Sequence, residues 1–203
     1  VSPALAELNF SRYADWDAQG GKAAVLAFAG DVYEGLDAPS LSPEALTWAQ
    51  SHLGILSGLY GLLRPLDEIQ PYRLEMGIRL PNARGRDLYA FWGTTLCEAI
   101  HEATLAASGT PCLINLASEE YFKAARAKDL DLPILTPVFE DAKNGQFKVI
   151  SFRAKRARGL MARFIIENRL ESPADLQKFS AGGYTFTPEA SSENKWVFRS
   201  SGH

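Results

Sequence analysis

Apolar positions recur along this chain with two different spacings, one typical of helices and one typical of strands. A spacing of three and four residues predicts helices at residues 2–11, 42–53, 87–107 and 151–170. Short apolar or alternating runs predict strands at residues 23–28, 112–116, 134–141, 147–152, 184–186 and 195–199. Helices and strands therefore both contribute to the fold.

Local start and turn signals support several of these elements. Ser42, followed by Pro43, is typical of a helix start, and Ser118 precedes two glutamates that favour the first turn of another helix. Asn144-Gly145 between two strand-like runs is a strong hairpin signal. The last two runs, YTF and KWVFR, are expected to pair as late strands.

The order of the elements indicates the fold class. Helices and strands alternate only partly, and one hairpin is evident, so we predict an α/β fold of α+β character, with one mixed sheet and helices packed on it. The sequence contains no internal repeat, low-complexity tract or long Pro/Gly/Ser linker. We therefore expect a single domain over residues 1–203.

Composition excludes several classes of protein. With 46% hydrophobic residues, the 203-residue chain can bury a substantial core. No apolar run approaches the roughly 20 residues that span a bilayer, and no leader pattern opens the sequence, so we expect a cytoplasmic protein. Its two cysteines form no C-x-x-C pair. The chain starts at Val1 inside an amphipathic pattern, and we therefore expect that an N-terminal portion precedes it.

The predicted helix at residues 151–170 is strongly basic, although the whole chain has net charge -3. Residues 148–169 hold seven basic residues and one acidic residue, a balance of +6, which leaves -9 for the remainder. Solvated helix faces usually interleave both signs, because like charges at i,i+4 destabilise a helix. An ordinary solvated face remains the alternative to a binding surface. One stripe of this helix is expected to face the core: Ala154, Ala157, Leu160, Met161, Phe164 and Ile165.

The basic face has small or apolar residues at its centre, namely Gly159, Ala162 and Ile166. We expect something to approach closely there. A guanidinium can hold two phosphate oxygens at once, so the arginine bias favours a phosphate ligand. A nucleic-acid backbone, a nucleotide and another polyanion all remain open. The predicted phosphate contacts are Lys155, Arg156, Arg158 and Arg163.

A second unusual segment is ILSGLYGLLRPLD, residues 55–67. Gly58 and Gly61 suit a tight hairpin whose backbone N–H groups are open to an anion, with Arg64 close by. An ordinary helix end and turn, with Pro65 preventing continuation, is the alternative for the same spacing.

Metal and catalytic chemistry have weaker support. Glu98-x-x-His101 has the spacing of one di-iron helix motif, but one copy does not make a site, and we expect neither a metal nor a cofactor. The chain contains no P-loop and no nucleophile elbow. An enzyme acting on a nucleotide or base, with Asp31 or Glu119 as general base, remains an alternative. Capping and turn hydrogen bonds explain the candidate polar residues equally well: Asp31, Tyr33, Asn115, Ser118 and Glu119.

Several uninterrupted blocks, in order and across nearly the whole chain, resemble the YaaA family of bacterial peroxide-stress proteins. The blocks are FAGDVYEGL, LSGLYGLLRPLDEIQPYRLEMGIRL, NARGRDLYAFWG, INLASEEYFK, PVFEDAKNGQFKVISF and AKRARGLMARFIIENRL. The resemblance implies a cytosolic protein made under hydrogen-peroxide stress that limits unincorporated iron and oxidative damage. It also implies DNA binding through a positively charged cleft, with a helix-hairpin-helix element in an α/β fold.

The chain departs from the family pattern in two places. Family members begin with a strand of I-S-P-A-K-T type, which this sequence lacks. A helix-hairpin-helix has a G-h-G hairpin, whereas Gly58-Leu59-Tyr60-Gly61 is one residue longer. We nevertheless assign the hairpin to this segment. The resulting expectation is a monomer that binds duplex DNA and no membrane.

Overall fold

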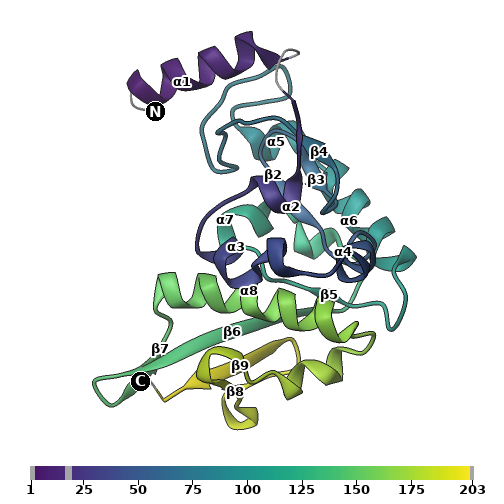
Figure 1. Cartoon of the computed structure of the whole chain (residues 1–203), viewed down its shortest axis with the longest axis vertical. Coiled ribbons are helices and arrows are strands. Elements are labelled where there is room, and N and C mark those ends of the chain that lie inside the picture. The colour runs from purple at the N-terminus through teal and green to yellow at the C-terminus, as the bar shows by residue number, and fades with distance from the viewer. Residues whose placement is uncertain (1–2, 17–19, 202–203) are drawn as a thin grey trace.

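The computed structural model describes residues 3–16 and 20–201, and Figure 1 shows their arrangement. The helices are α1 Pro3–Ala14, α2 Ala24–Ala27, α3 Asp31–Leu36, α4 Pro43–Ala49, α5 Leu88–Trp92, α6 Thr95–Ala106, α7 Glu119–Phe122 and α8 Ser151–Asn168. Short 3-10 helices are η2 Ala38–Ser40, η3 Lys123–Ala125, η4 Ala127–Asp129, η5 Pro173–Lys178, η6 Ala181–Gly183 and η7 Pro188–Ala190. The strands are β1 Lys22–Ala23, β2 Ile55–Ser57, β3 Gly61–Leu63, β4 Glu68–Ile69, β5 Leu113–Ile114, β6 Ile134–Lys143, β7 Gln146–Lys148, β8 Tyr184–Phe186 and β9 Lys195–Ser200.

The largest sheet is mixed, as predicted, and has the order β5-β6-β9-β8. Strand β6 pairs in parallel with β5 and β9, whereas β8 pairs antiparallel with β9, and the short β7 pairs antiparallel with the end of β6. Alternate residues of β6 are buried, which identifies the face that meets the core. Two further two-stranded sheets, β1-β4 and β2-β3, lie in the other half of the chain (Figure 1).

Two hairpin predictions are confirmed. Asn144 and Gly145 have φ of 54° and 76°, the left-handed values that a two-residue hairpin between β6 and β7 requires. Strands β8 and β9 pair in register, with Phe186 opposite Phe198. The predicted start signals also hold, because Ser42 Oγ accepts a hydrogen bond from Ala45 N at 3.2 Å. The helix that Ser42 caps is α4, which ends at Ala49 and not at the predicted residue 53.

The predicted strand at residues 23–28 is wrong for most of its length. Only residues 22–23 form strand β1, and the following alanine-rich turn is helix α2. A short, wholly apolar run cannot distinguish a strand from a buried helix, and alanine has the highest helix propensity. The tertiary setting decides here, because Ala24 N and Val25 N donate to the carbonyls of Asp67 and Pro65.

The predicted long helix at residues 87–107 is in fact two helices, α5 and α6. Gly93 adopts φ 53°, ψ -121°, a conformation that no helix contains, and so the chain turns there. The first helix starts as its sequence suggests, since the Asp87 carboxylate accepts a hydrogen bond from Ala90 N at 2.9 Å. The predicted helix at residues 2–11 is present as α1, although Ser2 lies outside the described residues.

Candidate site at the basic helix α8

Helix α8 is covered on two sides. One side packs on the large sheet through Ala154, Ala157 and Met161, which confirms the predicted core stripe. Another side packs against the layer that contains α3 and α4, through Ala162 and Ile166. Figure 1 shows α8 running between this layer and strand β6. The remaining exposed part of the helix is therefore narrower than the sequence pattern suggests.

The small residues at the centre of the basic face lie where α8 packs against α3. A Cβ atom added to Gly159 would overlap the carbonyl oxygen of Val32, and one added to Gly35 would overlap the carbonyl oxygen of Arg156. Both glycines are buried. The expected close approach at this position is therefore present, but the approaching group is the backbone of α3 and not a ligand.

Arg163 is directed into the same helix contact. Its Nη1 donates hydrogen bonds to the carbonyl oxygens of Leu36 and Asp37, both at 3.0 Å, and to Ser40 Oγ at 2.8 Å. Its Nη2 lies 2.7 Å from Glu167, and the side chain is only 22% exposed. These bonds satisfy carbonyl groups at the end of α3, which have no partner within the helix. Arg163 therefore holds α3 to α8, and a phosphate could reach it only by replacing several of these bonds.

Arg153, in the first turn of α8, is also committed to the protein. Its Nη1 donates to Asp141 Oδ1 at 2.9 Å, and the other oxygen of this carboxylate accepts from the Tyr184 hydroxyl at 2.8 Å. Asp141 is 1% exposed. Hydrogen bonding and the charge of Asp141 raise the pKa of Arg153. The arginine is thus an anchor between α8 and the sheet.

The three remaining cations of the N-terminal half are different. Lys155, Arg156 and Arg158 have no hydrogen-bonded or ion-pair partner among the described residues. Lys155 and Arg156 are exposed, whereas Arg158 is half-buried. Desolvation lowers the pKa of Arg158, and the nearby charge of Glu119 raises it in part. A guanidinium remains protonated in any case, so the structure holds a partly desolvated charge whose donors are free.

Glu119 approaches Arg158 from the turn that follows β5. Asn115 shapes this turn, since its Oδ1 accepts from Ala117 N at 3.1 Å and its Nδ2 faces Thr136 Oγ1 at 3.4 Å. Ser118 caps α7 by accepting from Tyr121 N. Asn115 and Ser118 therefore have local structural partners, and the exposed Glu119 is the candidate whose charge acts on the basic helix.

Asp31 and Tyr33 lie in the first turn of α3, directly after Gly30. The Tyr33 ring stacks on Phe28, with ring centroids 5.5 Å apart. Burial strongly raises the pKa of Tyr33, and the neighbouring Tyr72 and Tyr121 raise it further. Its surroundings therefore favour the neutral phenol form of Tyr33.

The segment with the paired glycines is a β-hairpin and not a helix-hairpin-helix. Strands β2 and β3 pair with Ser57 opposite Gly61, and the turn lies between them. The N–H groups of Leu59 and Tyr60 donate to Ser57 Oγ at 3.2 and 2.9 Å. Gly58 and Gly61 are buried, and the N–H groups of the turn between them already have an acceptor within the protein. The alternating burial of both strands explains the fold of this segment, because Ile55 and Leu63 face the core.

Arg64, the remaining expected phosphate contact of this segment, forms an ion pair with Asp67. Its Nη2 lies 2.9 Å from Asp67 Oδ1. The carboxylate also accepts from the backbone N–H of Arg64 at 2.8 Å, which closes the turn after β3. The arginine side chain is 67% exposed and lies outside α8.

Within the described residues, the Glu98-x-x-His101 spacing is not accompanied by further metal ligands. Glu98 and His101 lie on α6 and line a surface pocket with Asp129 and Asp131. Across residues 3–16 and 20–201, no group of three or more His, Cys, Asp or Glu side chains has an arrangement that could hold a metal ion. Within the same residues, no helix combines the length and the apolar character that crossing a bilayer requires.

Comparison with known proteins identifies the family. A family model described as peroxide stress protein YaaA matches residues 1–190. A UPF0246 protein of Ralstonia nicotianae is 60% identical over 203 residues, which cover 98% of this chain and 79% of the relative. A UPF0246 protein of Burkholderia mallei is 56% identical over 204 residues, covering 98% of this chain and 78% of that protein. The chain thus belongs to the YaaA family of peroxide stress proteins.

Proposed function

We propose that this peroxide-stress protein binds duplex DNA through the N-terminal half of α8, and that Lys155, Arg156 and Arg158 contact the phosphates. The observation that carries the proposal is the partition of the basic helix. Arg153 and Arg163 are tied to the fold, whereas the other three cations lie within a stretch of four residues and no described residue bonds to their donors. Structural pairing therefore does not explain why these three charges are present.

The half-buried Arg158 gives the strongest support. Removing a charge from water without a partner costs free energy, and a bound phosphate would compensate for it with charge-assisted hydrogen bonds. Lys155 and Arg156 lie within one turn and add exposed positive charge beside it. This arrangement fits the regularly spaced phosphates of a DNA strand better than it fits a small buried anion.

This role would place the protein in the cytoplasm with the chromosome, as a monomer that acts where peroxide damages DNA. Limitation of intracellular iron belongs to the same proposal as a cellular consequence. It requires no iron ligand set in this chain, and the pocket beside Glu98 and His101 supplies none within the described residues.

The salt dependence of duplex affinity tests this proposal. Neutralising about three phosphates gives a slope of log K against log salt of about -3, because each contact contributes about -0.9. Lys155→Gln or Arg156→Gln is expected to reduce the slope by about one, whatever the DNA sequence. Lys128→Gln, a change to an exposed lysine of η4, serves as the control and should leave the slope unchanged. An affinity that does not respond to salt would refute the phosphate contacts.

An enzyme that acts on a nucleotide or base is the second candidate. The specific observation is the charge of Glu119 beside Arg158, at the carboxyl end of the parallel strand β5. Ligands of α/β sheets commonly bind at such ends. In that case Arg158 would hold the phosphate and Glu119 would serve as general base. Glu119→Gln would then abolish turnover of the nucleotide and leave duplex affinity largely intact.

A further inference from the structure

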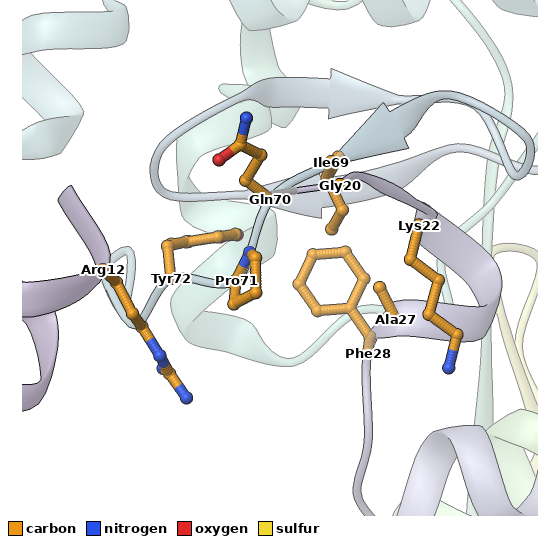
Figure 2. A pocket seen from close by; sticks show the side chains of 9 residues that line it. All are labelled: Arg12, Gly20, Lys22, Ala27, Phe28, Ile69, Gln70, Pro71 and Tyr72. Atoms are coloured by element: carbon orange, nitrogen blue, oxygen red, sulfur yellow. The ribbon is translucent and has the colours of Figure 1, made fainter. Parts of the chain in front are cut away.

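A second cationic site lies away from α8, in a pocket of about 240 Å³ between α1, the β1-α2 segment and the chain after β4. Arg12 and Lys22 line it together with Phe28, Pro71 and Tyr72 (Figure 2). None of the described residues that line it is acidic. In Figure 2 the charged ends of Arg12 and Lys22 extend to the same side, and the rings of Phe28, Pro71 and Tyr72 lie between them.

The aromatic wall of this pocket is fixed by the surrounding structure. Tyr33 stacks on Phe28, and Tyr72 packs nearly perpendicular to the same ring, with centroids 6.1 Å apart. The Tyr72 hydroxyl shares a hydrogen bond with Ser57, whose side chain is fully buried. Burial raises the pKa of Tyr72 to about 12, so its phenol is neutral and does not repel an anion. The rings are thus held in place before any ligand arrives.

The chemistry of the pocket combines a planar apolar wall with positive charge on one side. This combination complements a flat aromatic ring that carries a phosphate, because bases stack on aromatic side chains and phosphates pair with Lys and Arg. The volume lies below the roughly 300–1,000 Å³ of pockets that enclose drug-sized ligands, so it fits one base and not a dinucleotide.

We propose that this pocket binds one nucleoside monophosphate unit, with its base against Phe28 and its phosphate held by Lys22. The unit is either a free nucleotide or an unpaired nucleotide within DNA. The free-nucleotide case is independent of the DNA-binding function proposed above, and the unpaired-nucleotide case rests on it.

Fluorescence of 2-aminopurine, which stacking on an aromatic ring quenches, tests the inference. The probes are 2-aminopurine deoxyribonucleoside monophosphate, a duplex with one unpaired 2-aminopurine, and a fully paired duplex. We expect quenching of the free nucleotide or of the unpaired base. Phe28→Leu, which keeps an apolar side chain but removes the ring, should weaken that binding about tenfold. Lys22→Gln should weaken it about fivefold to tenfold without disturbing the core, because Lys22 is exposed.

The outcomes separate this inference from the proposed function. Quenching of the free nucleotide alone supports a nucleotide site, and quenching of the unpaired base alone supports a site for DNA with an unpaired position. If the paired duplex binds but neither the free nucleotide nor the unpaired base is quenched, the proposed nucleotide site is refuted. DNA binding by α8 is then unaffected. Equal quenching by the unchanged protein, by Phe28→Leu and by Lys22→Gln would also refute the nucleotide site. Absence of paired-duplex binding, with the free nucleotide quenched, refutes the α8 proposal only.

Discussion

Replacing Asp141 with alanine is expected to lower the free energy of unfolding by about 3 kcal/mol or more. The buried carboxylate joins three elements, because it lies on β6 and accepts hydrogen bonds from Arg153 of α8 and Tyr184 of β8. Its removal leaves the Tyr184 hydroxyl buried without this acceptor and leaves the Arg153 guanidinium without its partner. Urea unfolding followed by circular dichroism measures the loss.

Asp175→Ala is the matched control, since Asp175 forms an ion pair with Lys178, whose side chain is 75% exposed. Surface pairs of this kind contribute about 1 kcal/mol or less. Equal effects of the two substitutions would contradict the anchoring role of Asp141.

The same cluster predicts a loss of stability at high pH. Burial, and then the neighbouring Asp141, raise the pKa of Tyr184 above its ordinary value of 10.0. A raised pKa in the folded state contributes stability that is fully present below pH 10 and is lost as pH rises above it. Tyr184→Phe should therefore make the alkaline decline shallower.

The second large effect is expected at the crossing of α3 and α8. Gly159→Ala should destabilise the protein by about 2–3 kcal/mol, because the added methyl group would overlap the Val32 carbonyl oxygen. The direction of this change in stability distinguishes a close helix crossing from an ordinary helix position. In an ordinary helix interior, Gly→Ala stabilises by about 0.5–1 kcal/mol. For a chain of this size, the predicted loss corresponds to a fall in Tm of roughly 4–12 °C.

Arg156→Ala, on the exposed part of the same helix, should change stability by no more than about 0.5 kcal/mol. Calorimetry of both variants compares them directly. A rise in Tm for Gly159→Ala would show that the two helices do not meet as closely as the structure describes.

The sequence pattern predicts those parts of the fold that depend on local signals. The sheet-facing stripe of α8 follows from helical periodicity, and the hairpin at Asn144-Gly145 follows from the left-handed conformation that these residues tolerate. The predicted strand at residues 23–28 is wrong because an apolar run does not reveal the tertiary hydrogen bonds that decide its conformation. The predicted single helix at residues 87–107 is wrong because apolar spacing does not reveal the backbone reversal at Gly93.

The candidate site is predicted only in part, for a physical reason. Small residues within the basic face do signal close approach, but the signal is the same whether a ligand or another helix approaches. Arg163 looks like its neighbours in the sequence, yet it bonds carbonyl groups of Leu36 and Asp37, which are distant in the chain. The pocket beside Phe28 leaves no motif, because separate segments contribute Arg12, Lys22 and Tyr72.

We propose that α8 contains two kinds of cation, those that hold the fold and those that contact DNA. The most direct test is the duplex affinity of Arg158→Gln and Arg163→Gln, measured side by side by fluorescence anisotropy at about 0.1 M salt on folded protein. Arg158→Gln should bind about fivefold to tenfold more weakly, as the loss of one phosphate contact predicts at this salt concentration. Arg163→Gln should bind within about twofold of the unchanged protein, because its donors already serve Leu36, Asp37 and Ser40. Equal losses in both variants, or a loss confined to Arg163→Gln, would contradict the account.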